Sequence, residues 1–363
     1  MKLSTRQGTL KTLAIFLAIS LLTTTASAQF DFGRNAPGGD GGRYLGGPRL
    51  GESQTQIWRT GVIIEPGAAM ENVQITIPVP MEWPEQRILS INEERMDGNL
   101  ASRIIYRYLN SGAIIRHPSD GAKVMQLQIR SLFPTRPVEI VVAFELQNFE
   151  LLPPEHTDRY IIPARNRVPP QYRQYLEPSP TIESRNQVFR RMFEEITRDR
   201  QTDWEKVEAL YSFVQNNVRY DDQARHRPAR GALAITRMPR GEWSADCKDM
   251  SNLFVALCRA GGIPARIVRV PEHCYVEFYL ELRQEGQPRN APPVGFWFPA
   301  QVAGTYAFGG IPERRVILQK GDAFPDPDHP GRQTLFLRQV FEGSLVPGSP
   351  PPRPRWIQEA IVR

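Results

Sequence analysis

Cys247 and His273 are the two residues of this sequence whose types and positions could carry out covalent chemistry together. Cys247 stands before an apolar run with helical spacing, so we expect it in the first turn of a helix. There the helix dipole and the unpaired N–H groups favour the thiolate, which is the nucleophilic form of cysteine. An imidazole is the usual proton-transfer partner of such a thiolate. The pair therefore points to attack on a carbonyl carbon through a thioester.

The elements that must position this pair can be read from the residue pattern. The helix of Cys247 is expected to end at Gly261 or Gly262, which form a natural C-cap. Two earlier helices are expected over residues 181–197 and 202–220, and Thr202 with Glu205 has the spacing of a capping box. The strand-like segments are residues 263–271, 273–283 and 295–304. Helices followed by strands predict an α+β domain.

The chain before these helices has a different pattern. Between residues 54 and 152, at least six short β-branched runs are separated by turn signals, which predicts an antiparallel β-sandwich. The expected order is a signal peptide (1–28), a Gly-rich linker (29–51), the β-sandwich domain (52–152), a Pro-rich connection (153–177), the α+β domain (178–345) and a Pro-rich tail (346–363). We expect the tail to be extended and mobile.

The first 28 residues have the pattern of a secretory signal peptide. Lys2, Arg6 and Lys11 precede the apolar run 12–22, and Ala26 and Ala28 form a cleavage site. We expect export to the periplasm or the extracellular space; an uncleaved N-terminal anchor is the alternative. No later segment is apolar enough to cross a bilayer.

Removal of the first 28 residues, with their three basic side chains, would lower the formal charge from +6 to +3. The remaining arginines are scattered among acids, which does not indicate a nucleic-acid partner.

The motifs around the pair resemble a known family. "DCKDMSNLFVALCRAGGIPARIV", followed by "HCYVEFYL" and "GFWFP", resembles the core of the transglutaminase-like superfamily, whose fold is related to papain. The likeness covers roughly residues 178–304 and depends on the combined order of the motifs. It implies a papain-like α+β core after the β-sandwich, with Cys247 and His273 as nucleophile and base. It also implies action on amide or peptide bonds of a protein or peptide substrate, as a protease, an amidase or a cross-linking acyltransferase, without cofactor or metal.

Gln301 is where the sequence departs from the family pattern. The family places an Asp four residues after a Trp, and the residue four positions after Trp297 is Gln301. A glutamine can accept a hydrogen bond from the imidazole, but it has no charge to stabilise an imidazolium. The alternative function is therefore an envelope scaffold or binding module with weak or lost catalysis.

The three cysteines lie within 28 residues and do not form a disulfide framework. We expect Cys258 to pack in the core as a small hydrophobic residue. Cys274 is also interpreted as packing, although its nearness to Cys247 leaves a redox latch open. A zinc site made of Cys247, His273 and Cys274 lacks the usual ligand spacing.

Two residues near the cysteine are assigned to the surroundings of the site. Trp243 either packs or donates its indole N–H to an oxyanion. The resemblance places Asp249 two positions after the nucleophile, where it is not the triad acid, and acids in a first turn also stabilise the helix.

Overall fold

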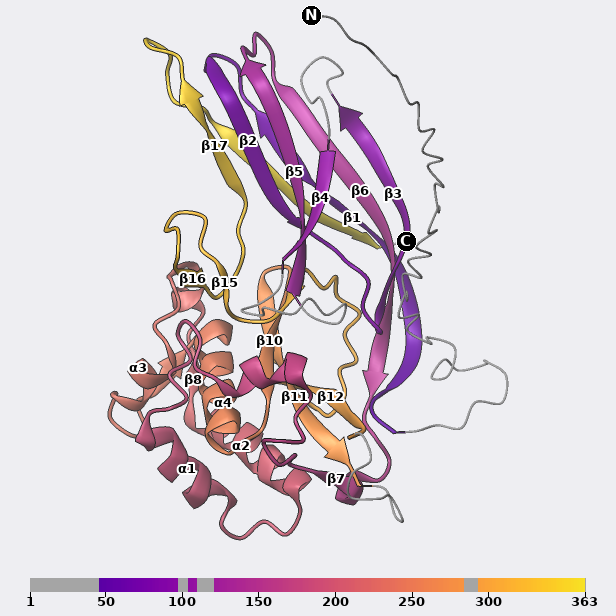
Figure 1. Cartoon of the computed structure of the whole chain (residues 1–363), viewed down its shortest axis with the longest axis vertical. Coiled ribbons are helices and arrows are strands. Elements are labelled where there is room, and N and C mark those ends of the chain that lie inside the picture. Colours follow the sequence, from indigo (N-terminus) through magenta and orange to yellow (C-terminus); the bar gives the residue numbers. More distant parts are fainter. Residues whose placement is uncertain (1–45, 97–103, 110–120, 284–292, 363) are drawn as a thin grey trace, which may run out of the picture. The chain divides into compact units, whose positions relative to one another are not determined.

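The computed structural model describes residues 46–96, 104–109, 121–283 and 293–362. The expected signal peptide and most of the Gly-rich linker lie outside the described residues. The described fold is α+β, with a sandwich of antiparallel strands followed by helices and a second group of strands, as the sequence predicts (Figure 1).

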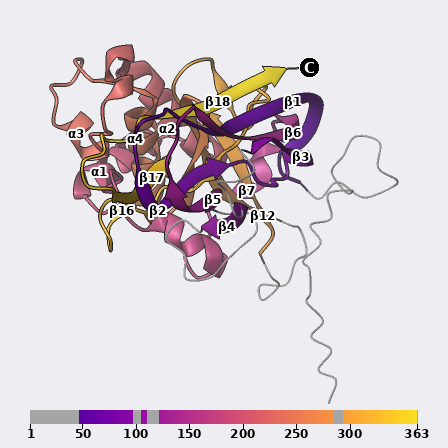
Figure 2. The same ribbon diagram turned by 90° about the horizontal axis from the view of Figure 1, so that it is seen from above.

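The sandwich is built from strands of the first half of the chain. They are β1 (Arg49–Ile64), β2 (Met70–Val79), β3 (Gln86–Met96), β4 (Ile104–Leu109), β5 (Gly121–Leu132) and β6 (Val138–Leu152). One layer contains β1, β6 and β3, and the other contains β4, β5 and β2 (Figure 2). Alternate residues point inward, because successive side chains of a strand face opposite sides. Trp58 and Ile140 from one layer therefore share a buried cluster with Ile75 and Leu127 from the other.

Two strands from the end of the chain complete this sandwich. β17 (Val340–Leu345) pairs with β2, and β18 (Pro354–Val362) pairs with β1 along its whole length. The prediction of a mobile tail is therefore wrong for β18. Proline is tolerated at the first residue of an edge strand, and after Pro354 the sequence alternates well enough to pair. Ile357 is buried there beside Ile63 and Val141.

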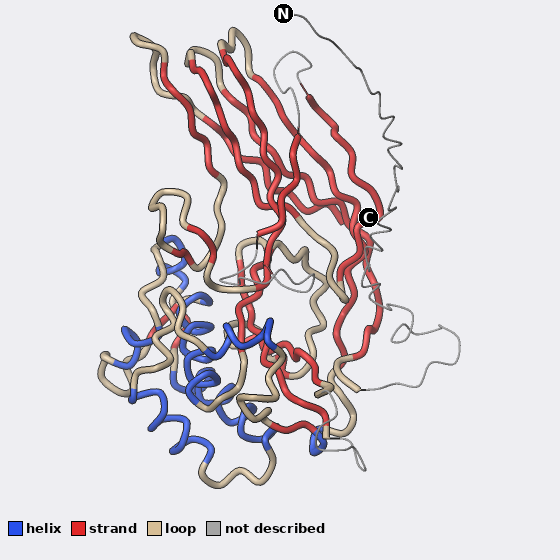
Figure 3. Tube along the Cα trace, viewed as in Figure 1, coloured by secondary structure: helices blue, strands red, loops and turns tan. Residues whose placement is uncertain are grey.

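The helices lie together after the sandwich strands (Figure 3). They are α1 (Gln187–Thr197), α2 (Asp203–Asn217), α3 (Ala232–Thr236) and α4 (Cys247–Ala260). The capping box at Thr202 and Glu205 is confirmed, since each residue accepts a backbone N–H of the other. Short connecting elements are η2 (Thr157–Arg159), β7 (Tyr160–Ile161), η3 (Pro170–Leu176), β8 (Arg219–Tyr220), η4 (Asp222–His226) and β9 (Ser244–Ala245).

A second group of strands carries the expected site. They are β10 (Ala265–Val270), β11 (His273–Leu282), β12 (Gly295–Gln301) and β13 (Ala307–Phe308), followed by β14 (Gln319–Lys320), β15 (Phe324–Pro325) and β16 (Gln333–Thr334). β14 pairs with β10 on one side and with β5 on the other. One sheet therefore runs from β12 into the sandwich layer of β5 and β2. The positions of the domain boundaries themselves stay predictions.

Helix α4 is the centre of the second core. Leu253, Phe254 and Leu257 are fully buried, and they share a cluster with Ile267 of β10 and Phe278 of β11. Full burial of each such side chain contributes about 1.5–3 kcal/mol. Most of the remaining helix is buried as well, which is typical of a helix enclosed by other elements. This packing fixes the helix start, and with it Cys247, against the strands.

A buried charge network ties the same strands to the sandwich. Glu277 of β11 accepts hydrogen bonds from Arg266 at 2.7 Å and from Lys320 at 2.5 Å. Lys320 also donates to Glu85, which lies between β2 and β3. Buried charges of this kind are stable only when each is paired. The glutamate of the "HCYVE" motif is therefore a structural residue here.

Candidate active site

Cys247 is the first residue of helix α4, as predicted. Asp246 is the N-cap and accepts the backbone N–H of Asp249 at 3.0 Å. The helix runs to Ala260, its C-cap is Gly261, and the following Gly262 has a left-handed backbone with φ 81°. Both local predictions for this helix, its start and its end, are therefore confirmed.

His273 is the first residue of β11, immediately after a two-residue turn. Val270 pairs with His273, and Pro271 and Glu272 form the turn between them. The turn fixes the position of His273 at the beginning of β11. This beginning of the strand lies close to the start of α4, where Cys247 is. Cys247 and His273 line the same pocket, which has a volume of about 320 Å³.

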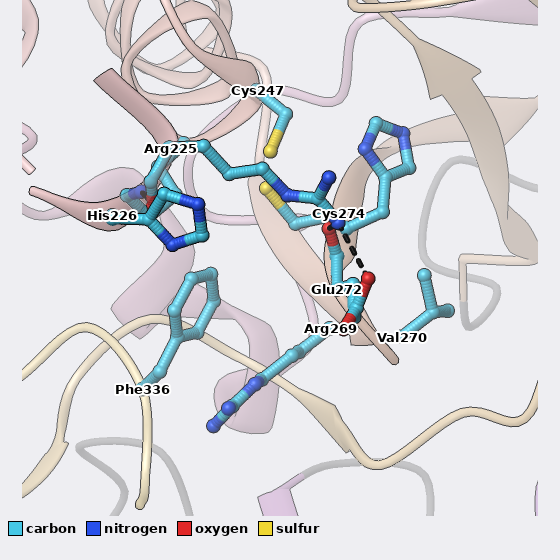
Figure 4. A pocket seen from close by; sticks show the side chains of 10 residues that line it. Arg225, His226, Cys247, Arg269, Val270, Glu272, Cys274 and Phe336 are labelled. Atoms are coloured by element: carbon cyan, nitrogen blue, oxygen red, sulfur yellow. Dashed lines mark hydrogen bonds and ion pairs between the residues drawn. The ribbon is translucent and has the colours of Figure 1, made fainter. Parts of the chain in front are cut away.

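Cys274 brings a second sulfur into this pocket. Figure 4 shows the sulfur atoms of Cys247 and Cys274 directed toward one another. The Cys274 side chain also lies 3.6 Å from the hydroxyl of Ser251, on the next turn of α4. Cys274 is buried, as expected of a residue that packs in the core. In addition, its thiol forms a hydrogen bond with Cys247.

The Cys247 thiol is strongly acidified. The hydrogen bond from Cys274 and the hydrogen bond and charge of His273 lower the pKa of Cys247 to about 5, against the opposing effects of burial and Asp246. The same contact raises the pKa of Cys274 well above its usual value. The two opposite shifts favour the proton on Cys274 and the thiolate on Cys247.

Gln301 is the last residue of β12, beside β11. Ala300 pairs with Val276, so the next residue on β12 lies on the same face of the sheet as Tyr275 and His273. The Gln301 side chain is buried, its nitrogen donates to the Thr305 carbonyl at 3.2 Å, and its carbonyl oxygen has no hydrogen-bond partner among the described residues. An unpaired acceptor on this face is compatible with orienting the imidazole, and that role stays a prediction.

Glu313 is a neighbour of Gln301 that the sequence did not reveal. Its carboxylate accepts a hydrogen bond from the Gln301 side-chain nitrogen at 3.2 Å and lies 2.6 Å from Arg315. Glu313 stands in a segment without regular structure and without a motif, so no sequence signal indicated it.

Trp243 and Asp249, the two residues near Cys247, both form hydrogen bonds within the fold. The Trp243 indole donates to the Met238 carbonyl at 3.0 Å, so the oxyanion role considered for it is not supported. The Asp249 carboxylate accepts the backbone N–H groups of Arg230 and Gly231 at 2.9 and 3.1 Å. Asp249 therefore holds the loop before α3 against the start of α4.

Cys258 is fully buried in the core, as expected, and its burial raises the pKa of its thiol. Within the described ranges, no three His, Cys, Asp or Glu side chains are grouped so that they could hold a metal ion. No helix in the described part of the chain is long and apolar enough to span a membrane.

Comparison with known proteins supports the family and the fold. The family model of the transglutaminase-like superfamily matches residues 190–301. No curated protein sequence matches the chain. The fold is similar to that of "a Putative Cysteine Protease from Cytophaga hutchinsonii", at 14% identity and a TM-score of 0.51, over 86% of this chain and 92% of that one. A weaker likeness is to the periplasmic domain of TgpA from Pseudomonas aeruginosa, at 14% identity and a TM-score of 0.31, over 69% of this chain and 87% of that one.

Proposed function

Residues 190–301 belong to the transglutaminase-like superfamily, and from this premise we propose that the chain is a cysteine enzyme that acts on amide or peptide bonds. The observation that carries the proposal is the shared pocket of Cys247 and His273, in which the pKa of Cys247 is lowered to about 5. A thiolate at neutral pH, held at a helix start beside an imidazole, is the usual form of an activated cysteine nucleophile.

The proposed reaction has two halves. The Cys247 thiolate attacks the carbonyl carbon, and the backbone N–H of Cys247 stabilises the oxyanion. The C–N bond breaks as His273 gives its proton to the leaving amine, and a thioester on Cys247 remains. The acyl group then passes either to water, as in a protease or amidase, or to a lysine amine, as in a cross-linking enzyme.

Alkylation by iodoacetamide at pH 7, followed by peptide mass mapping, tests the reactive thiolate. We expect fast labelling of Cys247, loss of that labelling in Cys247→Ser, and slower labelling in His273→Asn. Cys258→Ser is the matched control, because that thiol is buried with a raised pKa. Labelling of Cys247 no faster than that of a free cysteine peptide would refute the proposal.

Gln301 favours a second candidate, a binding scaffold with weak or lost catalysis. An amide in place of the acid orients the imidazole without stabilising its positive charge, which lowers the expected rate. A scaffold predicts folded protein that binds peptides and labels slowly at Cys247, whereas the enzyme predicts rapid labelling.

We also propose that the protein is exported to the periplasm or beyond. The support is the basic start, the apolar run and the small residues that end at Ala28. N-terminal sequencing of the protein from its natural host should begin at Gln29. A sequence that begins at Met1 would favour the membrane-anchored alternative.

A further inference from the structure

Two neighbouring cavities share His273 and the Arg225–Glu272 ion pair in their walls. The first is the pocket of about 320 Å³ that contains Cys247. The second has a volume of about 420 Å³ and does not reach Cys247. Both are lined by Arg225, Glu272 and His273. The side chains of Arg225 and Glu272 contact one another, and a dashed line marks this contact in Figure 4.

The ion pair that both cavities share is weakly held. Arg225 lies 2.7 Å from the Glu272 carboxylate, and the two side chains are 36% and 82% exposed. Exposed ion pairs of this kind contribute little to stability, because solvent screens them and both side chains lose freedom. Opening requires the loss of this ion pair and of a second contact, in which Arg225 donates to the Glu272 carbonyl at 3.2 Å.

Glu272 has a backbone conformation that its residue type disfavours. Its φ is 57°, in the left-handed region, and it follows Pro271 in the turn before His273. Glycine is the usual residue at the second central position of such a turn. Strained residues of this kind are concentrated at functional sites. Because Glu272 is the residue before His273, its ion pair with Arg225 lies next to His273.

Part of the wall of the second cavity comes from the sandwich. Trp58 of β1 and Ala360 of β18 are directly paired, and both line it, as does Gln358. These residues are far from Cys247 in the sequence, and none belongs to the matched segment 190–301. The β-sandwich therefore contributes surface to this second cavity.

We propose that this second cavity is a substrate subsite, joined to the Cys247 pocket when the Arg225–Glu272 pair opens. The inference rests on the proposed function and specifies its substrate class as an extended polypeptide rather than a small amide. Each cavity alone falls in the range of a small-molecule site, and together they form a longer path. Gln358 supplies both a donor and an acceptor for a peptide backbone along that path.

Two thiol probes with the same reactive group test the subsite. The short probe is iodoacetamide, and the long probe is iodoacetyl-tetra-alanine amide. Ala360→Trp should fill the second cavity and slow labelling of Cys247 by the long probe at least fivefold, with the short probe changed less than twofold. Ile361→Trp is the matched control, because neighbouring residues of a strand face opposite sides, and it should change neither rate.

The ion pair is tested by a second variant that does not depend on filling the cavity. Arg225→Gln should raise the ratio of the long-probe labelling rate to the short-probe labelling rate severalfold. Arg190→Gln, at another exposed ion pair, is its control. An unchanged long-probe rate in Ala360→Trp, together with an unchanged ratio of the two rates in Arg225→Gln, would overturn the subsite while iodoacetamide still labelled Cys247. Failure of iodoacetamide to label wild-type Cys247 would instead overturn the proposed function, and the subsite with it.

Discussion

Cys274 donates a hydrogen bond to Cys247, and this contact is the largest of the effects that lower the pKa of the Cys247 thiol. The two residues come from different elements, the start of α4 and the start of β11. A neutral thiol is thus an acidifying group here, alongside the imidazole of His273. Cys274, which follows the expected base His273 in the sequence, therefore also stabilises the Cys247 thiolate.

Cys274→Ala should raise the pKa of Cys247, because the thiolate loses its strongest donor. A hydrogen bond to a charged group contributes about 1.5–3 kcal/mol, which corresponds to roughly one to two pH units. In the wild type, alkylation by iodoacetamide should fall as the pH drops through about 5. In Cys274→Ala the same fall should occur at a higher pH. Cys258→Ala is the control, and an identical midpoint in all three proteins would contradict the contact.

Gln301 should influence the site through its side-chain carbonyl oxygen, which has no hydrogen-bond partner among the described residues. Gln301→Ala removes that acceptor, so the rate of Cys247 labelling at neutral pH should fall. Gln301→Asp alone would bring a carboxylate toward Glu313, which now accepts from the glutamine nitrogen. We therefore expect Gln301→Asp to raise the rate most clearly when combined with Glu313→Gln. Equal rates in Gln301→Ala and the wild type would show that another residue orients His273.

Lys320→Met should destabilise the fold strongly. It leaves the carboxylates of Glu85 and Glu277 buried without their shared cation. Removing one member of a buried ionic group costs about 3–5 kcal/mol. The free energy of unfolding from urea denaturation measures this loss. Arg190→Met breaks an exposed pair and should cost below about 1 kcal/mol, and a similar value for Lys320→Met would mean that the network is solvated.

Removal of residues 354–363 should make the protein aggregate. The deletion strips β18 from β1 and exposes a long strand edge together with Ile63 and Val141. Unprotected edges of this kind pair with other chains. Size-exclusion chromatography should show larger species, whereas deletion of residue 363 alone should leave the elution unchanged. A monomeric, folded truncated protein would show that β18 does not protect the edge.

The sequence was most informative where the signals are local. The N-terminal position of Cys247 and the glycine pair after Ala260 lie within one helix, so the motif alone located both ends of α4. The capping box of Thr202 and Glu205 spans three residues and was equally clear. Alternation of apolar residues similarly predicted the sandwich strands, because their period does not depend on which strand is the partner.

What could not be predicted depends on contacts between distant residues. Gln301 and Glu313 meet through a loop without periodicity, and the pairing of β1 with β18 joins residues about 300 positions apart. The prolines of residues 346–355 suggested a tail, because composition does not reveal that an edge strand is available to pair. The acidifying role of Cys274 follows from its place beside Cys247, which neither thiol indicates by itself.

The pairing of the first described strand with the last has a consequence for how the molecule is made. Gln56 pairs with Val362, so β1 cannot gain its outer neighbour until nearly all of the chain has left the ribosome. A structure that depends on such distant pairs has high contact order and folds slowly. While β18 is awaited, the edge of β1 is open to other chains. Final closure of the sandwich is thus a late, post-translational event, and the chain stays open to misassembly until its C-terminus arrives.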